Sequence, residues 1–248
     1  MYDPPVYLWT ITIAGPVAIA AWTCVGLYAG AVRAGLGRTR ARVLAGAAGV
    51  LFGGWFVGTA VIAGRGWYDT RPDQVPWLAV SIFGYLGTLL ALSRIPIVAR
   101  ALSAPGMAAR LVLPHSFRVA GVFFLLYMAL GHLPALFALP AGLGDIAAGI
   151  AAPLVVRRLR QGTGRRAAIW FNVYGIFDVV TALTIGTLLG FGLPDITPSI
   201  APINEPPLAI VTTANVPLMV ALNISCLAVL ARASRPAPLV GAAPRGVR

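Results

Sequence analysis

Three ionisable side chains lie within long apolar stretches of the sequence and are the first candidates for chemistry: His132, Asp145 and Asp178. An ionisable group inside a membrane is costly, so such a residue marks a functional site by default. A carboxylate can take up and release a proton or a cation, and a histidine changes charge between about pH 5 and 8. We therefore predict that all three belong to a pathway for protons or a small solute. The alternative is that they only hold helices together.

The three residues are expected at two depths. His132 and Asp145 fall near the outer ends of two segments joined by a turn at Leu139-Pro140, which would bring them within reach of each other. Asp178 falls near the middle of its segment, roughly 16 Å from either end at a helical rise of about 1.5 Å per residue. Its expected partners on the same and the next segment are Tyr174, Asn215 and Asn223.

The last apolar segment carries a polar stripe. Residues spaced by three or four positions share one face of a helix. The members of this face are Thr212, Asn215, Met219, Asn223 and Cys226. In lipid, such a face turns toward other helices. Together with Asn172, on the segment that holds Asp178, the amides extend the predicted pathway; hydrogen bonding that merely holds the bundle is the alternative.

Membrane helices must position these residues. Hydrophobic residues make up 58% of the chain and charged residues 10%, with a mean hydropathy of +0.84, which excludes a soluble globular enzyme. A membrane helix needs about 20 apolar residues. The segments that qualify are Val6–Ala29, Val43–Ala63, Val75–Ala99, Phe117–Ala138, Ala141–Val156, Ala167–Leu189 and Leu208–Ala231. We predict an all-α, polytopic bundle of seven transmembrane helices in residues 1–231, followed by a disordered basic cytoplasmic tail in residues 232–248.

The positive charges indicate an orientation. All 19 basic residues are arginines, and the formal net charge is +12. They gather in alternate loops and in the tail, whereas the loop between the sixth and seventh segments carries Asp195 and Glu205 and no arginine. Because positive loops face the cytoplasm, we predict an external N-terminus and a cytoplasmic C-terminus in the cell membrane. Topology thus explains the charge, and nucleic acid is not an expected partner.

One short motif resembles that of a known family. The run Gly142-Leu143-Gly144-Asp145 is similar to the GxGD motif of intramembrane aspartyl proteases of the presenilin and signal-peptide-peptidase type. Those enzymes pair this aspartate with a second one on a neighbouring helix and carry a Pro-Ala-Leu segment. Here Asp178 and Pro134-Ala135-Leu136 are the matching residues, but both stand in reversed order along the chain. The resemblance implies a carboxyl pair that shares one proton.

Several cofactors are not indicated. The chain has no lysine, which excludes a retinal Schiff base. His115 is expected at the cytoplasmic end and His132 in the outer third, so the two cannot clamp one haem within a monomer. Cys24 and Cys226 each lie alone in an apolar segment. We predict no cofactor and no metal site.

These features favour a small proton-linked transporter or permease for a small solute or ion. Asp178 would couple the proton, and His132 with Asp145 would form an outer gate. A second hypothesis is a non-catalytic subunit or sensor of a larger membrane complex, with a bound lipid or pigment. A membrane-protein partner or a homo-oligomer is compatible with both. A third is a membrane-embedded enzyme that uses Asp145 and Asp178, although the sequence leans away from catalysis.

Overall fold

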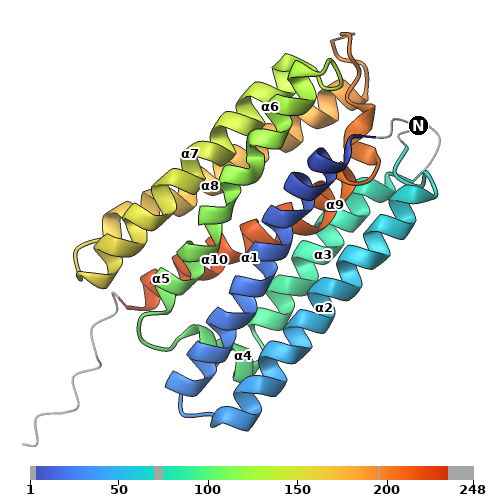
Figure 1. Cartoon of the computed structure of the whole chain (residues 1–248). Helices are drawn as coiled ribbons and strands as arrows, with labels where there is room; N and C mark the ends of the chain where they lie inside the picture. The colour runs from blue at the N-terminus through green and yellow to red at the C-terminus, as the bar shows by residue number, and fades with distance from the viewer. Residues whose placement is uncertain (1–3, 70–74, 195, 234–248) are drawn as a thin grey trace, which may run out of the picture.

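The computed structural model of the chain describes residues 4–69, 75–194 and 196–233. Within these residues the protein is built of helices and has no strand. The long helices run side by side and alternate in direction (Figure 1). The predicted all-α class is therefore confirmed. Two features of the sequence lie outside the described residues. One is the charged loop residues Arg71, Asp73 and Asp195, and the other is the predicted tail from residue 234 onward.

The helices differ in length but mostly match the predicted segments. In chain order they are α1 (Val6–Arg33), α2 (Arg38–Gly64), α3 (Trp77–Ser93), α4 (Pro96–Leu102), α5 (Met107–Val112), the 3₁₀ helix η1 (Leu113–Gly121), α6 (Val122–Ala129), α7 (Ala135–Arg160), α8 (Arg165–Gly190), the 3₁₀ helix η2 (Ala201–Asn204), α9 (Leu208–Ile210), the π-helical turn η3 (Val211–Asn215) and α10 (Val216–Arg232). Among the described residues, six continuous helical runs are long and apolar enough to cross a membrane. A seventh results if α3 and α4, bent by 84°, count as one span.

The fourth and fifth spans differ from the prediction. The fourth comprises α5, η1 and α6 and begins at Met107, ten residues before Phe117. The turn that follows lies between Leu130 and Pro134, where Gly131 adopts a positive φ of 76°, and not at Leu139-Pro140. Helix α7 runs through Pro140. A proline removes one helical hydrogen bond, a loss that neighbouring helices make tolerable inside a membrane bundle.

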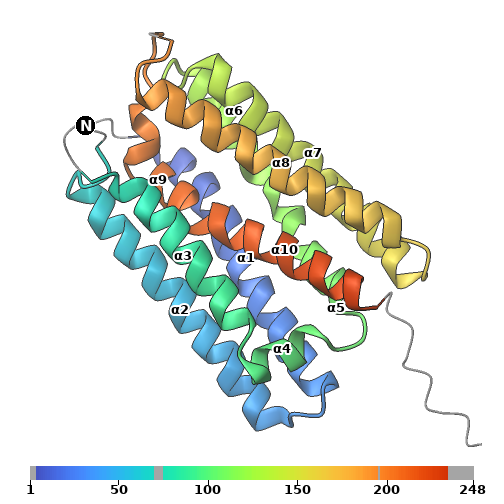
Figure 2. The ribbon, with the colours of Figure 1, turned by 180° about the vertical axis from the view of Figure 1, so that it is seen from behind.

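Helix α10 occupies the centre of the bundle. It packs against α3 on one side and α8 on the other, and α5 lies against its C-terminal half. Figure 2 shows α10 between α3 and α8, with α2 beyond α3 and α7 beyond α8. The span Met107–Ala129 packs through η1 against α1 and α7. Three elements therefore meet near the middle of the bundle, η1, α7 and α8, and these carry the candidate site.

The arginines of the described residues gather at one end of the bundle, which we call the arginine-rich end. Here lie the α1–α2, α4–α5 and α7–α8 connections and the end of α10 (Figure 1). The arginines near this end are Arg33, Arg38, Arg40, Arg42, Arg94, Arg100, Arg110, Arg157, Arg158, Arg160, Arg165, Arg166 and Arg232. The opposite end holds Arg65, Asp69 and Glu205 among its described charged residues.

Candidate functional site

Two carboxylates share one guanidinium in the interior of the bundle. Arg118 donates from Nε to Asp145 Oδ1 at 2.7 Å, and its Nη2 lies 2.6 Å from the same oxygen. Nη2 also donates to Asp178 Oδ2. We call Arg118, Asp145 and Asp178 the ion cluster. It joins residues that are 27 and 60 positions apart in the chain.

All three members of the ion cluster lie at mid-helix. Arg118 is the central residue of the 23-residue span Met107–Ala129. Asp145 and Asp178 each lie within three residues of the midpoint of a 26-residue helix, α7 and α8 respectively. The prediction of a central Asp178 agrees with this placement. The expected shallow position of Asp145 is wrong, because α7 begins at Ala135 and places this carboxylate deeper.

Glycines allow the three helices to approach at the ion cluster. A methyl group on Gly121 would overlap the Asp145 side chain, and one on Gly144 would overlap Asp178 Oδ1. A methyl group on Gly149 would lie 2.5 Å from the backbone nitrogen of Val119. Small residues at helix contacts let backbones come close together. These glycines therefore set the short helix separation that the charged side chains need in order to meet.

The charges of the ion cluster do not balance. With all groups ionised, two carboxylates face one guanidinium, which leaves one negative charge. The Arg118 side chain is 1% exposed, whereas those of Asp145 and Asp178 are 13% and 12% exposed. Buried charges are stable only when they are paired and hydrogen-bonded. Arg118 Nη1 has no hydrogen-bond acceptor among the described residues, so the ion cluster retains both an excess charge and an unused donor.

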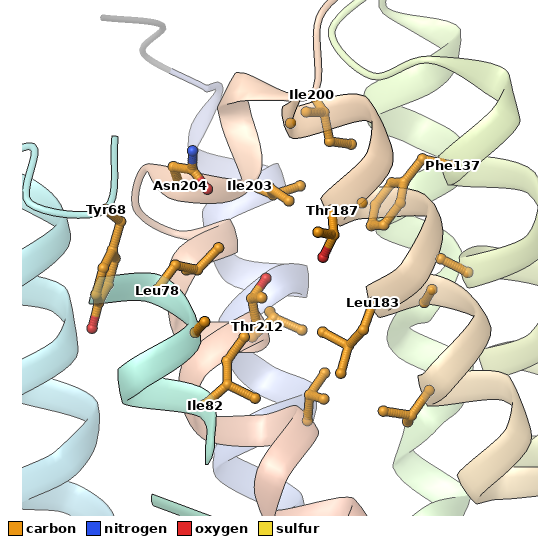
Figure 3. Close-up of a pocket in the computed structure, with 18 of the residues that line it drawn as sticks. Tyr68, Leu78, Ile82, Phe137, Leu183, Thr187, Ile200, Ile203, Asn204 and Thr212 are labelled. Carbon is orange, nitrogen blue, oxygen red and sulfur yellow. The ribbon is translucent and has the colours of Figure 1, made fainter. Parts of the chain in front are cut away.

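A cavity of about 370 Å³ reaches the ion cluster from the opposite end of the bundle. Figure 3 shows Leu78 and Ile82 on α3 facing Leu183 and Thr187 on α8 across it. The η2 region lies at its outer end, with Asn204 in the lining (Figure 3). The lining also includes Arg118, Asp145 and Asp178. The cavity is therefore an apolar space with charged groups at its inner boundary.

Buried polar side chains continue from the ion cluster toward the arginine-rich end. A methyl group on Gly175, one turn before Asp178, would lie 2.8 Å from Asn223 Nδ2. Asn172, one turn further, donates from Nδ2 to the Ala168 carbonyl at 2.6 Å. His115, one turn before Arg118, is fully buried and makes an edge contact with Phe171. Asn223 and His115 have side-chain polar atoms without hydrogen-bond partners among the described residues.

A second group of polar side chains supports the wall of the cavity that lies across from α8. Tyr68 Oη lies 2.6 Å from Thr59 Oγ1 and donates to Ser81 Oγ at 3.1 Å. Thr59 is also hydrogen-bonded to Thr213, in the π-helical turn. Trp55 Nε1 donates to the Thr213 carbonyl at 2.9 Å, which gives that buried carbonyl a partner from outside the turn. These bonds connect α2, α3 and η3 and hold the cavity wall in place.

The structure brings together some of the predicted site residues and separates others. His132 lies in the turn before α7, and Asp145 is ten residues beyond the start of that helix, about 15 Å at the helical rise. The expected His132–Asp145 contact is therefore replaced by the Arg118–Asp145 ion pair. Tyr174 is 40% exposed and donates to the Gly144 carbonyl at 3.4 Å, beside the ion cluster.

The amides also differ from the expectation. Asn215 donates to Met219 Sδ at 3.8 Å, so its hydrogen bond is with its own helix rather than with Asp178. Asn223 and Asn172 lie on the arginine-rich side of Asp178, as buried residues at the α8–α10 contact. Their places fit a polar route that leaves the ion cluster. Their roles in a pathway remain predictions.

Sequence reasoning missed Arg118. Arg118 is the second residue of the predicted segment Phe117–Ala138, and at the end of a span an arginine needs no explanation. The available signal was compositional: the 23 residues centred on Arg118 are apolar enough to form a span of their own. A second signal was that two carboxylates in apolar segments need a positive partner.

The geometry differs from that of a protease dyad. One guanidinium nitrogen lies between the two carboxylates, in the position where an aspartyl protease has a shared proton. Within the described ranges, no three side chains of His, Cys, Asp or Glu gather in a way that could hold a metal ion. The arrangement can bind a proton or a cation at the carboxylates.

A family profile matches residues 75–231, more than half of the chain. The chain therefore belongs to the family described as a domain of unknown function, DUF8737. The matched region runs from α3 to the end of α10 and contains the whole ion cluster. Comparison with curated proteins and with solved structures gives no match.

Proposed function

We propose that this DUF8737 protein is a proton-linked permease for a small solute or ion in the cell membrane. In this proposal α3 and α4 form one bent span, so the chain crosses the bilayer seven times. The arginine-rich end faces the cytoplasm, as the positive-inside rule requires. The N-terminus and the entrance of the cavity then lie outside, and α10 ends inside.

The observation that carries the proposal is the unbalanced ion cluster at the inner boundary of the cavity. A structural ion pair needs one carboxylate for each guanidinium, and here there are two. The second carboxylate has a charge that a proton or a bound cation can neutralise. Because both ligands neutralise the same charge, the binding of one disfavours the binding of the other, which is the thermodynamic basis of exchange.

The buried polar residues supply a route beyond the ion cluster. Asn223, Asn172 and His115 lie successively closer to the arginine-rich end, on the side away from the cavity. Buried polar atoms are normally hydrogen-bonded, and several of these have no partner among the described residues. A small rearrangement of α8 against α10 would open these groups to the cytoplasm while the outer cavity closes. Helices that alternate in this way around a central site are typical of permeases.

The accessibility of one buried position tests this proposal without knowledge of the solute. Met219 lines the cavity together with Asp178, and a cysteine there replaces one sulfur side chain by another. The Met219→Cys variant is made with Cys24→Ala and Cys226→Ala, and it is treated with a membrane-impermeant maleimide. A permease exposes this position in turn to both sides. We therefore expect labelling in intact cells and in inverted membrane vesicles.

Two exposed positions provide matched controls. Asp69→Cys, at the opposite end of the bundle, should react only in intact cells, and Gln161→Cys, in the α7–α8 connection, only in inverted vesicles. Reversal of these two results would overturn the orientation. Labelling of Met219→Cys from a single side would overturn the permease. It would favour the subunit or sensor hypothesis, for which a partner protein should then co-purify in a fixed ratio.

A further inference from the structure

We propose that the cavity binds an amphiphilic organic cation, an ammonium or similar group with an apolar body, that enters sideways from the lipid between α3 and α8. As a statement about cargo, this inference rests on the proposed permease. As a statement about binding, it rests on the cavity and the ion cluster alone. It selects one ligand class among the small solutes and ions that permeases carry.

The charge that the cavity presents is negative. Its inner boundary contains one guanidinium and two carboxylates, but the guanidinium side chain is almost completely buried beneath them. The two carboxylate side chains remain 13% and 12% exposed. A ligand in the cavity therefore meets the carboxylates first, and a cation is attracted while an anion is repelled.

The walls of the cavity select an apolar ligand. They are formed mainly by aliphatic and aromatic side chains, among them Ile82, Phe83, Phe124, Phe137, Leu183 and Phe191. A hydrated metal ion or a sugar would have to give up its water for walls that offer few hydrogen bonds, at high cost. An organic cation buries its apolar body against these walls. Aromatic faces add a favourable interaction with its positive charge.

The edge of the cavity reaches the lipid-facing surface of the bundle. Phe83 on α3 lines the cavity and is 63% exposed, and Phe191, just after α8, lines it and is also 63% exposed. Leu78 and Ile82 face Leu183 and Thr187 across the intervening space (Figure 3). With α10 behind this space, the side between α3 and α8 is open to apolar molecules dissolved in the bilayer.

The ion cluster also has polar atoms that the described part of the protein does not satisfy. Arg118 belongs to the cavity lining, and only 3% of the residue is exposed. Its Nη1 has no hydrogen-bond acceptor among the described residues. At the other end of the cavity, Asn204 Oδ1 likewise has no donor there. Native interiors rarely leave such atoms unpaired. Asn204 Oδ1 is an acceptor that the N–H of an ammonium ligand would satisfy, whereas Arg118 Nη1 is a donor that needs an acceptor such as a water molecule in the cavity.

Tetraphenylphosphonium and tetraphenylborate provide a direct test, since they have the same shape and opposite charges. Binding of each ion to the purified protein in nanodiscs is measured by equilibrium dialysis at pH 8, with protein-free nanodiscs as the blank. We expect saturable binding of tetraphenylphosphonium and none of tetraphenylborate. Asp178→Asn should weaken cation binding at least tenfold. Glu205→Gln, which removes one acid outside the cavity lining, should leave it unchanged.

A second variant covers the case in which Asp178→Asn fails to fold. Leu183→Trp keeps all charges and fills part of the cavity, so it should also abolish saturable binding. The inference is overturned if tetraphenylphosphonium shows no saturable binding, if tetraphenylborate binds equally well, or if binding survives in both variants. Two-sided labelling of Met219→Cys without cation binding would leave a permease for another cargo. Cation binding with one-sided labelling would leave the binding site and remove the permease.

Discussion

Replacement of Arg118 by leucine tests whether the ion cluster holds the bundle together. The substitution removes two ion pairs and leaves two carboxylates close together in the interior, with side chains only 13% and 12% exposed. Removing one partner of a buried ion pair costs about 3–5 kcal/mol, because the remaining charge is left uncompensated. For a chain of this length about 1 kcal/mol corresponds to roughly 2–4 °C in the midpoint of thermal unfolding. We expect the midpoint of Arg118→Leu to fall by about 6–20 °C.

The assay compares four proteins by thermal unfolding in the same detergent. Arg110→Leu is the matched control, since it removes an arginine from the same span, near Arg33 and Arg160 and at the arginine-rich end. It relieves repulsion between like charges and should leave the midpoint unchanged within about 2 °C. The combined variant Arg118→Leu/Asp145→Leu/Asp178→Asn removes all three charges. Because a buried ionic group can be replaced by neutral side chains at little cost, it should be more stable than Arg118→Leu alone.

Two results would refute the reasoning. If Arg118→Leu unfolds within about 2 °C of the wild type, the ion pairs contribute nothing measurable to stability. If the neutral triple variant is no more stable than Arg118→Leu, the loss of stability does not come from uncompensated carboxylates. A loss of packing around the long arginine side chain would then be the cause.

Three further predictions address coupling, helix approach and the cavity wall. Asp178→Asn leaves a balanced Arg118–Asp145 pair, so this variant should elute like the wild type in size-exclusion chromatography. In proteoliposomes it should lose all solute-dependent proton movement. Normal coupling would contradict the role of Asp178. Gly144→Ala should lower stability by about 1–3 kcal/mol through overlap with Asp178, whereas Gly58→Ala, which meets no neighbour, should not, as thermal unfolding can check. Trp55→Phe removes the donor to the Thr213 carbonyl and should cost about 1–3 kcal/mol in the same assay; an unchanged midpoint would show that this bond does not hold the wall.

The sequence was sufficient to predict the long helices. Apolar length and alternating charge are local properties, and α1, α2, α8 and the last span follow them closely. The turn before α7 was misplaced because Pro140 was interpreted as a helix break. Inside a bundle, proline is compatible with a continuous helix. The conformation that makes the turn belongs to Gly131, which is one of 28 glycines in the chain.

The candidate site was predicted only in part, since its decisive contacts are between distant residues. Asp145 and Asp178 were recognised because each is an acid in an apolar segment. Arg118 follows Pro114, His115 and Ser116, and such a polar run is typical of a loop. Nothing near it in the sequence indicates that its partners lie 27 and 60 residues further on. The pairing therefore becomes visible only when the packing of η1, α7 and α8 is known.

The number of charges in the ion cluster separates a binding role from a purely structural one. A guanidinium that joins two helices needs one carboxylate. The second carboxylate brings a third helix, α8, into the contact, but it also leaves one buried charge uncompensated. Here the additional carboxylate is held by close helix contacts at Gly121 and Gly144 and remains partly open to an apolar cavity. A neutral acceptor on α8 would make the same connection without the excess charge, so helix association alone does not explain the second carboxylate. The proposed binding of a proton or an organic cation would neutralise the additional charge, and it would also account for the greater exposure of the carboxylates than of the guanidinium at the cavity.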